Sequence, residues 1–246
     1  MGKLDGKVAI VTGGGTGIGK GIARALIGEG CKVVIAARDF GRLESAAEEL
    51  GKNGTVLPIQ TDVTVEGSVI ALFEKTMAQF GRLDLLVNNA GAVAGGETGD
   101  ISIEEWDMVM AVNVRGVFLC IREAFKIMKV AGGGRIINVG AISALRAREG
   151  ASPYTTSKHA ITGLTRSTAL DGRQYGISCG QLNPGNTAVE SLAAGEETGG
   201  LEPLDEPMVQ VADVASAALS MAVLPPEANV LELTLLHVGQ PYLGRG

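Results

Sequence analysis

Short apolar runs alternate with longer amphipathic stretches along the whole chain. The short runs have the length and the Val, Ile and Leu content of buried strands, and the stretches between them are long enough for helices. This alternation is typical of strand–helix units repeated around a parallel sheet. We therefore predict one α/β domain with a seven-stranded parallel sheet and helices on both faces. The expected strands are residues 7–12, 32–37, 55–60, 83–88, 135–139, 177–182 and 230–235.

One stretch breaks this alternation. Residues 188–207 are rich in Gly and Glu, and we expect them to form a mobile loop or a short pair of helices over a site. We take residues 186–207 as the candidate substrate-binding segment. The five glutamates and one aspartate between Glu190 and Glu206 are most simply a solvated face, and they disfavour a carboxylate-rich substrate only if they point inward.

The composition fits a globular protein, because 46% of the 246 residues are hydrophobic and the mean hydropathy is +0.24. No apolar run approaches the roughly 20 residues that a membrane-spanning helix needs. The first residues lead into the first expected strand without the apolar region of a secretory signal, so we expect a cytoplasmic protein. The formal net charge is −6 and basic residues do not cluster, which argues against nucleic acid or a membrane surface and favours a small-molecule partner.

Residues that serve as metal ligands or nucleophiles are scattered. Cys31, Cys120 and Cys179 lack metal-ligand spacing and lie in apolar segments, where a buried free thiol is the ordinary state. His159 and His237, the only histidines, are far apart in the sequence and have no suitably placed carboxylates. We therefore expect no metal site and no Ser-His-Asp hydrolase.

A glycine-rich turn follows the first expected strand. The chain reads Thr-Gly-Gly-Gly-Thr-Gly-Ile-Gly at positions 12–19 and then continues into a helical pattern. Glycines there allow a tight turn and a close approach of the backbone to a pyrophosphate, and the helix N-terminus favours negative charge. Glycine also serves turns and helix packing, but the strand before and the helix after indicate a dinucleotide site.

Tyr154 and Lys158 are four residues apart in a segment with a helical pattern, so their side chains share one face of the helix. A neighbouring ammonium favours the phenolate, and we expect it to draw the tyrosine pKa down from about 10 toward neutrality. A phenol tuned in this way is suited to acid–base catalysis. For an isolated pair at this spacing, the alternative is a helical surface pair without a chemical role.

Three further motifs complete the set: Asn-Asn-Ala-Gly at 88–91, Val-Asn-Val around Asn113, and Pro-Gly at 184–185. In order and spacing, the five motifs resemble the short-chain dehydrogenase/reductase family over nearly the whole chain. The resemblance implies a Rossmann-type, doubly wound sheet in a single domain spanning residues 1–246. It also implies an oxidoreductase that moves a hydride between a nicotinamide cofactor and a carbonyl or alcohol.

The resemblance also implies roles for individual residues. Tyr154 passes the proton to the substrate oxygen, Lys158 reaches the nicotinamide ribose, and Asn113 supports a proton-relay water. Asp62 has the alternative role of capping the helix that begins near Val65, and the asparagines at 88 and 89 that of simple turn residues. The implied cofactor contacts are Gly13, Gly15, Thr16, Gly17, Ile18, Gly19, Arg38, Asp62, Val63, Asn89, Ala90, Gly91, Tyr154, Lys158, Pro184, Gly185 and Thr187.

The residues after the second strand favour NADP(H), although NAD(H) stays possible. NAD-binding relatives place a carboxylate there for the ribose hydroxyls, whereas this chain has Ala37 followed by Arg38. A guanidinium offers a 2′-phosphate a charge-assisted, bidentate partner. The alternative for Arg38 is a solvated arginine at a strand end, with Asp39 reducing its field.

The chain departs from the family pattern at two places. The serine that hydrogen-bonds the substrate oxygen is replaced by Ala141, whose methyl group cannot donate a hydrogen bond. Ser143 either takes over this role or is a capping or solvent-facing serine. After Pro184-Gly185, the usual threonine position holds Val189, so Thr187 or Asn186 would supply the side-chain contact.

Three functions are consistent with these residues. The first is an NADPH-dependent reductase of a small carbonyl compound, of the 3-oxoacyl type or another ketone. The second is a cofactor-binding regulatory or scaffold protein whose catalysis is weakened or lost because of Ala141. The third, an NAD-linked alcohol dehydrogenase, is opposed by Ala37 and Arg38. The resemblance implies a homotetramer, or a dimer, paired through helices at about 103–130 and 153–175.

Overall fold

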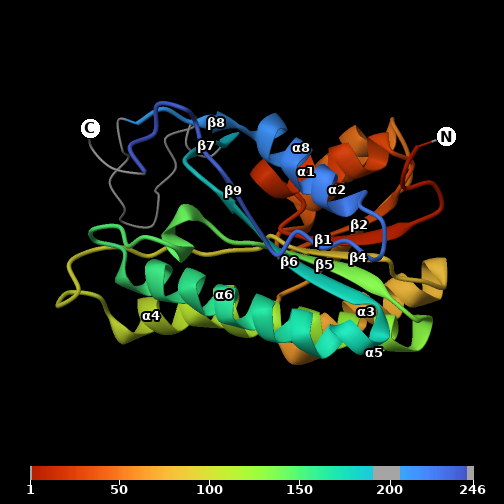
Figure 1. The fold of residues 1–246 in the computed structure, drawn as a ribbon, viewed down its shortest axis with the longest axis horizontal. Helices are drawn as coiled ribbons and strands as arrows, with labels where there is room; N and C mark the ends of the chain where they lie inside the picture. The colour runs from red at the N-terminus through yellow and green to blue at the C-terminus, as the bar shows by residue number, and fades with distance from the viewer. Residues whose placement is uncertain (1, 191–205, 243–246) are drawn as a thin grey trace.

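The computed structural model describes residues 2–190 and 206–242 and has three layers, a parallel sheet between two groups of helices (Figure 1). The sheet has seven strands in the order β3-β2-β1-β4-β5-β6-β9. This confirms the predicted Rossmann-type sheet, with strand ends within two residues of those expected. The strands are β1 (Val8–Thr12), β2 (Lys32–Ala37), β3 (Val56–Gln60), β4 (Leu85–Asn88), β5 (Gly134–Val139), β6 (Ile177–Pro184) and β9 (Glu232–Leu235).

The strand order reverses direction between β1 and β4, which are neighbours although two strands separate them in the chain. Parallel sheets bind ligands in the crevice at the carboxyl ends of the strands, at such a switch point. The glycine-rich turn follows β1 and the Asn-Asn-Ala-Gly motif follows β4. The topology therefore brings these two motifs to one place.

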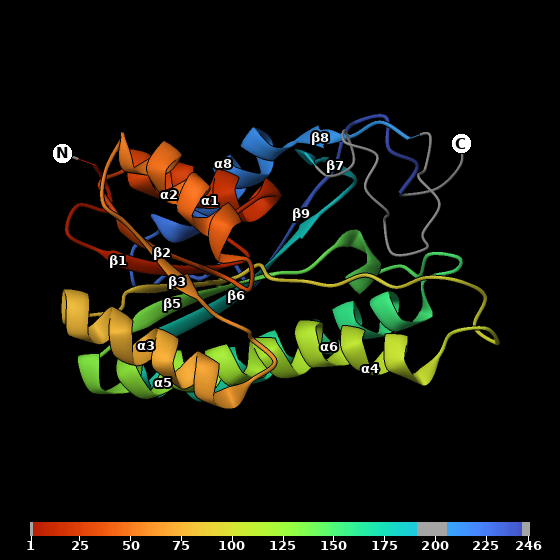
Figure 2. The same cartoon turned by 180° about the vertical axis from the view of Figure 1, so that it is seen from behind.

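Helices cover both faces of the sheet (Figures 1 and 2). One group consists of α1 (Gly17–Gly28), α2 (Phe40–Gly51) and α8 (Val211–Ala222). The other consists of α3 (Glu66–Phe80), α4 (Ile103–Met110), α5 (Val117–Ala131) and α6 (Ser152–Gly172), with the short 3-10 turns η2 (Ile142–Ala144) and η3 (Arg173–Tyr175).

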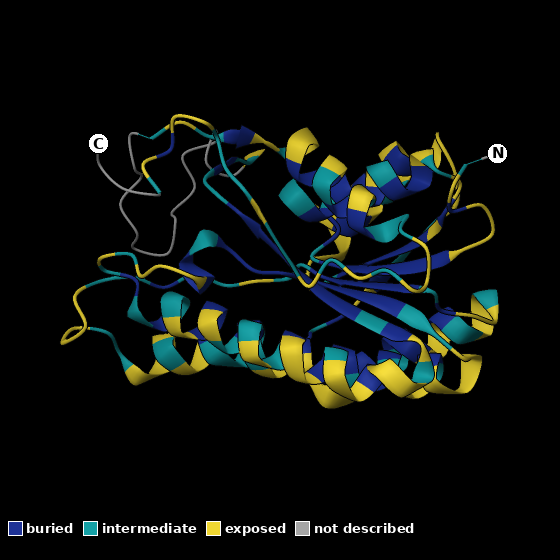
Figure 3. Cartoon of the chain, in the orientation of Figure 1, coloured by how far each residue is buried: buried dark blue, intermediate teal, exposed yellow. Residues whose placement is uncertain are grey.

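The central strands are buried on both sides (Figure 3), which explains why they are continuous apolar runs in the sequence. One apolar core lies between the sheet and α1, α2 and α8, and includes Ile22 and Leu43. A second core, with Leu72, Ile136 and Ile161, lies between the sheet and the other helices. No helix of the described residues is both long enough and apolar enough to span a bilayer.

Two features were not predicted from the sequence. A six-residue π-helical segment, η1 (Ala111–Gly116), joins α4 to α5 within the expected long helix. Two short strands, β7 (Thr187–Ala188) and β8 (Val209–Gln210), pair outside the main sheet. This pair joins the start of the candidate substrate-binding segment to the residues that follow its end. The prediction for the interior of that segment falls largely on residues 191–205, outside the described residues.

A ladder of polar side chains crosses the sheet, since Asn88, Asn138, Gln181 and Glu232 are aligned in register on four neighbouring strands. Asn88 Nδ2 donates to Asn138 Oδ1 at 2.9 Å, and Asn138 Nδ2 donates to Thr165 Oγ1 at 2.9 Å. Thr165, on α6, donates in turn to Gln181 Oε1 at 3.3 Å.

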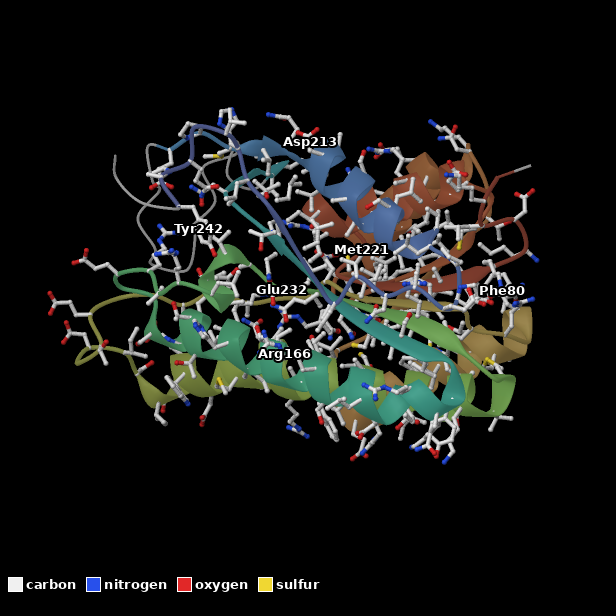
Figure 4. All side chains as sticks on the ribbon, in the orientation of Figure 1. Phe80, Arg166, Asp213, Met221, Glu232 and Tyr242 are labelled. Carbon is white, nitrogen blue, oxygen red and sulfur yellow. The ribbon has the colours of Figure 1, made fainter. Side chains whose placement is uncertain are left out.

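The ladder continues to the protein surface. Gln181 Nε2 donates to Asn183 Oδ1 at 2.7 Å, and Asn183 Nδ2 donates to Glu232 Oε1 at 3.4 Å. Glu232 then pairs with the exposed Arg166 of α6 at 3.5 Å (Figure 4). Hydrogen bonds of this kind allow polar residues to remain within an apolar sheet.

We predict that Asn138→Ala lowers the free energy of unfolding by about 2–4 kcal/mol, because it leaves the buried amide of Asn88 unpaired and opens a cavity. Urea denaturation measures this change. Glu232→Gln, at the exposed end of the ladder, is the control and should cost less than about 1 kcal/mol. Equal losses for the two variants would contradict the prediction.

Candidate active site

The glycine-rich turn forms a cradle at the N-terminus of α1. Gly17 has φ of +51°, a conformation that favours glycine, and a Cβ on Gly19 would lie 2.2 Å from the carbonyl oxygen of Gly13. Thr16 is the N-cap residue but makes no side-chain hydrogen bond to the helix. The first amides of α1 thus lack a cap from Thr16, and the turn fits the pyrophosphate of a dinucleotide.

Thr12 holds the two strand ends together, a role that the sequence did not reveal. Its hydroxyl accepts hydrogen bonds from the amides of Asn89 at 3.0 Å and Ala90 at 3.1 Å. Asn89 Nδ2 donates to the carbonyl oxygens of Thr12 at 3.0 Å and Gly13 at 3.2 Å. The side chain of Asn89 is therefore used to join the turn after β4 to the glycine-rich turn, and Gly91 follows on the exposed side.

Arg38 is exposed at the carboxyl end of β2, and its carbonyl accepts a hydrogen bond from Gln60 Nε2 at 2.9 Å. The neighbouring Asp39 is the N-cap of α2, where its carboxylate accepts from the amide of Arg42 at 3.0 Å. The negative charge of Asp39, which was expected to reduce the field of Arg38, is thus partly directed at the N-terminus of α2.

Asp62 does not cap α3, since Val65 is the N-cap residue and provides no side-chain hydrogen bond. The carboxylate of Asp62 instead accepts from the amide of Thr64 at 2.9 Å and from its hydroxyl at 2.7 Å. Burial pushes the pKa of Asp62 upward, but these hydrogen bonds and the charge of Arg38 lower that pKa below its usual value. Its neighbour Val63 is buried.

Tyr154 and Lys158 lie in the first two turns of α6, which begins at Ser152 with Pro153 in its first turn. Lys158 Nζ is 5.4 Å from the centre of the Tyr154 ring and donates a hydrogen bond to the carbonyl of Val139 at 3.1 Å. The lysine is buried and the tyrosine half-buried. The ammonium is thus positioned between α6 and the end of β5.

The pKa of Tyr154 differs in direction from the sequence expectation. Burial raises the pKa of the phenol to about 12, although the charge of Arg148 acts in the opposite sense. Burial also lowers the pKa of Lys158 to about 8. Removing each group from water disfavours its charged form, and this is the largest effect on both pKa values. In the protein without ligand, the phenol is therefore protonated at neutral pH.

Asn113 lies in the π-helical segment with its side chain buried. Its Oδ1 accepts from the amide of Ala92 at 2.7 Å, and its Nδ2 donates to the carbonyl of Ala92 and to Ser157 Oγ, both at 2.9 Å. Ser157 Oγ donates to the carbonyl of Tyr154 at 2.7 Å. Ser157 was not predicted, and it joins Asn113 to the helix turn that carries the tyrosine.

Ala141 is buried at the end of β5, where the serine was expected. Ser143 follows in the short turn η2, which packs against α6, and is also buried. Among the described residues, its hydroxyl has no hydrogen-bond partner. Ser143 is not the N-cap residue of η2 or of α6, since these positions are Ala141 and Ala151.

Pro184 ends β6, and the following amide of Gly185 donates to the carbonyl of Leu235 at 2.8 Å. Thr187 Oγ1 donates to the carbonyl of Gly185 at 3.0 Å, so this side chain is engaged within its own turn. Val189 lies next to Gly17, with its Cγ1 3.4 Å from the position that a Cβ on that glycine would take.

A cavity of about 450 Å³ lies beside the glycine-rich turn, between the first turns of α1 and α2, and does not reach Tyr154. Its lining combines cationic and anionic side chains. It is lined by Gly15, Thr16, Gly17, Lys20, Gly41, Arg42, Ser45, Ala46, Glu49, Val189 and Glu190. Residues 2–190 and 206–242 contain no group of His, Cys, Asp or Glu arranged to hold a metal ion.

The lowered pKa of Lys158 predicts a pH dependence of stability. Between the folded value of about 8 and the ordinary value of 10.5, the unfolded chain binds a proton that the folded protein has lost. The free energy of unfolding should therefore rise with pH in this window, by about 2 kcal/mol more in the wild type than in Lys158→Met. Urea denaturation at pH 7.5 and 10 tests this, and the same change in both proteins would contradict it.

Comparison with known proteins identifies the family. A family model described as short chain dehydrogenase matches residues 7–198. An uncharacterised oxidoreductase of Staphylococcus aureus (strain MRSA252) is 31% identical over 237 residues, which covers 96% of this chain and 99% of that protein.

Two solved structures share the fold. One is an alcohol dehydrogenase from the archaeon Thermococcus sibiricus complexed with 5-hydroxy-NADP, with a TM-score of 0.83, 28% identity, and coverage of 95% of this chain and 97% of that chain. The other is a 3-ketoacyl-(acyl-carrier-protein) reductase from Brucella melitensis complexed with NADH, with a TM-score of 0.84, 29% identity, and coverage of 94% and 97%. Because the family model spans most of the chain, this protein belongs to the short chain dehydrogenase family and is an oxidoreductase acting on CH–OH or C=O groups with a nicotinamide cofactor.

Proposed function

We propose that the protein is an NADPH-dependent reductase of a small carbonyl compound, with Tyr154 as the proton donor. The observation that supports this most is the placement of Tyr154 and Lys158 on one face of α6, with Asn113 and Ser157 fixing the backbone of that turn. Lys158 contacts the carbonyl of Val139 at the end of β5, and Asn113 contacts Ala92 after β4. The cradle for the dinucleotide follows β1 at the same carboxyl edge of the sheet.

When bound, the nicotinamide supplies the hydride to the substrate carbon. Tyr154 gives its phenolic proton to the carbonyl oxygen as negative charge develops there. Because the pKa of the phenol is about 12, the residue is in its donating form throughout the neutral range. Lys158, with a pKa of about 8, is mostly an ammonium at pH 7 and stabilises the phenolate that proton transfer leaves.

A second donor to the substrate oxygen is missing at Ala141, and we propose that Ser143 replaces it. Ser143 is buried two residues further on, and its hydroxyl is unpaired among the described residues. A hydroxyl without a protein partner is available to a substrate carbonyl. Loss of one such donor typically slows catalysis by about 10²- to 10³-fold.

This proposal predicts opposite effects of two substitutions. Ser143→Ala should lower kcat by about tenfold or more, because no hydroxyl then reaches the substrate oxygen. Ala141→Ser should raise kcat on the same substrate, since it restores a donor at the expected position. Steady-state kinetics on an active compound from a panel of ketones and aldehydes measures both. An unchanged kcat in Ser143→Ala would show that Tyr154 is the sole donor.

The preference for NADPH rests on Arg38, which is exposed at the end of β2 beside Ala37. A 2′-phosphate would gain a charge-assisted partner there, and no carboxylate occupies the position of Ala37 to repel it. The structural relatives include complexes with both kinds of cofactor. The proposed preference for NADPH therefore rests on the residues at the end of β2 in this chain.

Arg38→Ala should weaken NADPH binding by about ten- to a hundredfold and leave NADH binding nearly unchanged, because only NADPH carries the 2′-phosphate. Fluorescence titration gives the two Kd values. Lys32→Ala removes an exposed cation from the opposite end of β2 and serves as the control. Tighter binding of NADH than of NADPH by the wild type would refute the proposed preference.

Ala141 also supports a second candidate, a cofactor-binding regulatory or scaffold protein without significant turnover. NADPH binding without turnover on a broad panel of ketones, aldehydes and alcohols would favour it. An NAD-linked dehydrogenase has no comparable support in the structure.

For the assembly we propose a homotetramer, or a dimer, because exposed apolar residues occur on α4 and α5. The three free, buried cysteines are consistent with a cytoplasmic location.

A further inference from the structure

Glu190 follows the β7 strand and lies at the N-terminal end of α1. Its Oε1 is 2.9 Å from Nζ of Lys20, in the first turn of that helix. Lys20 Nζ is also 3.5 Å from Oε2 of Glu49 on α2, and Glu49 pairs in addition with Arg24. The cradle thus has a lysine that is shared between two carboxylates of its own chain.

Glu190 is anionic at neutral pH. The hydrogen bond from Lys20 holds the pKa of Glu190 below its ordinary value, and the charge of Arg24 and the backbone amide of Gly17 act in the same direction. Gly17 is the first residue of α1, so this carboxylate lies where a helix N-terminus favours negative charge.

The segment that carries Glu190 lies against the turn. Val189, in the place where the family pattern has a threonine, has its Cγ1 3.4 Å from the position that a Cβ on Gly17 would take. The segment is anchored on its other side, because Thr187 pairs with Val209 and the amide of Val209 donates to the carbonyl of Asn186 at 2.8 Å. The position of the carboxylate is therefore supported by packing and backbone pairing as well as by the ion pair.

We propose that the carboxylate of Glu190 occupies part of the dinucleotide cradle as an anion supplied by the protein itself. The pyrophosphate of the cofactor must displace this carboxylate from Lys20 and from the N-terminus of α1. The inference rests on the proposed function only in that the cradle binds a dinucleotide. A carboxylate and a pyrophosphate at the same cationic end of a helix repel each other, so Glu190 weakens cofactor binding. Glu190 is thereby a residue that sets cofactor affinity.

The test compares the Kd of NADPH for the wild type, Glu190→Gln and Glu49→Gln by fluorescence titration without substrate. Glu190→Gln should bind about three- to tenfold more tightly, because an amide keeps the size of the side chain and removes its charge. Glu49→Gln is the matched control, since it removes the other carboxylate from Lys20, and its effect should be smaller because Glu49 belongs to α2. The gain should shrink at 0.5 M salt, where exposed charges are screened.

Calorimetry with two smaller probes tests which part of the cofactor competes. Glu190→Gln should also bind ADP more tightly than the wild type does, and should bind adenosine equally, because only ADP carries the pyrophosphate. Unchanged or weaker NADPH binding by Glu190→Gln would overturn the inference, and a weaker value would make Glu190 a contributor to the bound state. A wild type that binds neither NADPH nor NADH would instead refute the proposed function.

Discussion

The site depends on one buried amide, that of Asn113, which makes three hydrogen bonds to two segments that are distant in the sequence. Two of these bonds fix the loop after β4, and the third fixes Ser157 and with it the carbonyl of Tyr154. The amide lies in a π-helical segment, a feature frequently found at functional sites. Tyr154 and the loop after β4 are therefore joined through one side chain, that of Asn113.

Burial determines the chemistry of this arrangement. The ammonium of Lys158 is buried and the phenol of Tyr154 is half-buried, and the loss of hydration has the largest effect on the pKa of each. Without ligand, the phenol of Tyr154 therefore keeps its proton. The ammonium of Lys158 loses its proton at a lower pH than the phenol does. A protonated phenol is the form that can donate a proton.

The sequence predicted the sheet well because each strand is an apolar run between turn residues, a pattern that needs no knowledge of distant contacts. It missed β7 and β8, since two-residue strands have no periodicity, and the π-helical segment, since its apolar spacing resembles that of an α-helix. The hydrogen bonds of Thr12 and Ser157 were not predicted, because their partners, Asn89 and Asn113, are 77 and 44 residues away in the sequence. The direction of the Tyr154 pKa was wrong because spacing reveals a neighbour but not its burial. The roles of Arg38 and Ser143 stay predictions.

The polar ladder across the sheet also has a consequence for folding accuracy. The edge strand β9 has only four residues and pairs with β6 alone, so its backbone hydrogen bonds give little protection against a shift by one position. A one-residue slip would turn Glu232 toward the face where Leu233 and Leu235 now pack, and would place a leucine opposite Gln181. Asn183 and Arg166 would then lose their acceptor, and a carboxylate would be left in an apolar layer. The carboxyl group of Glu232 thus favours the native register of β9, the edge strand next to β6.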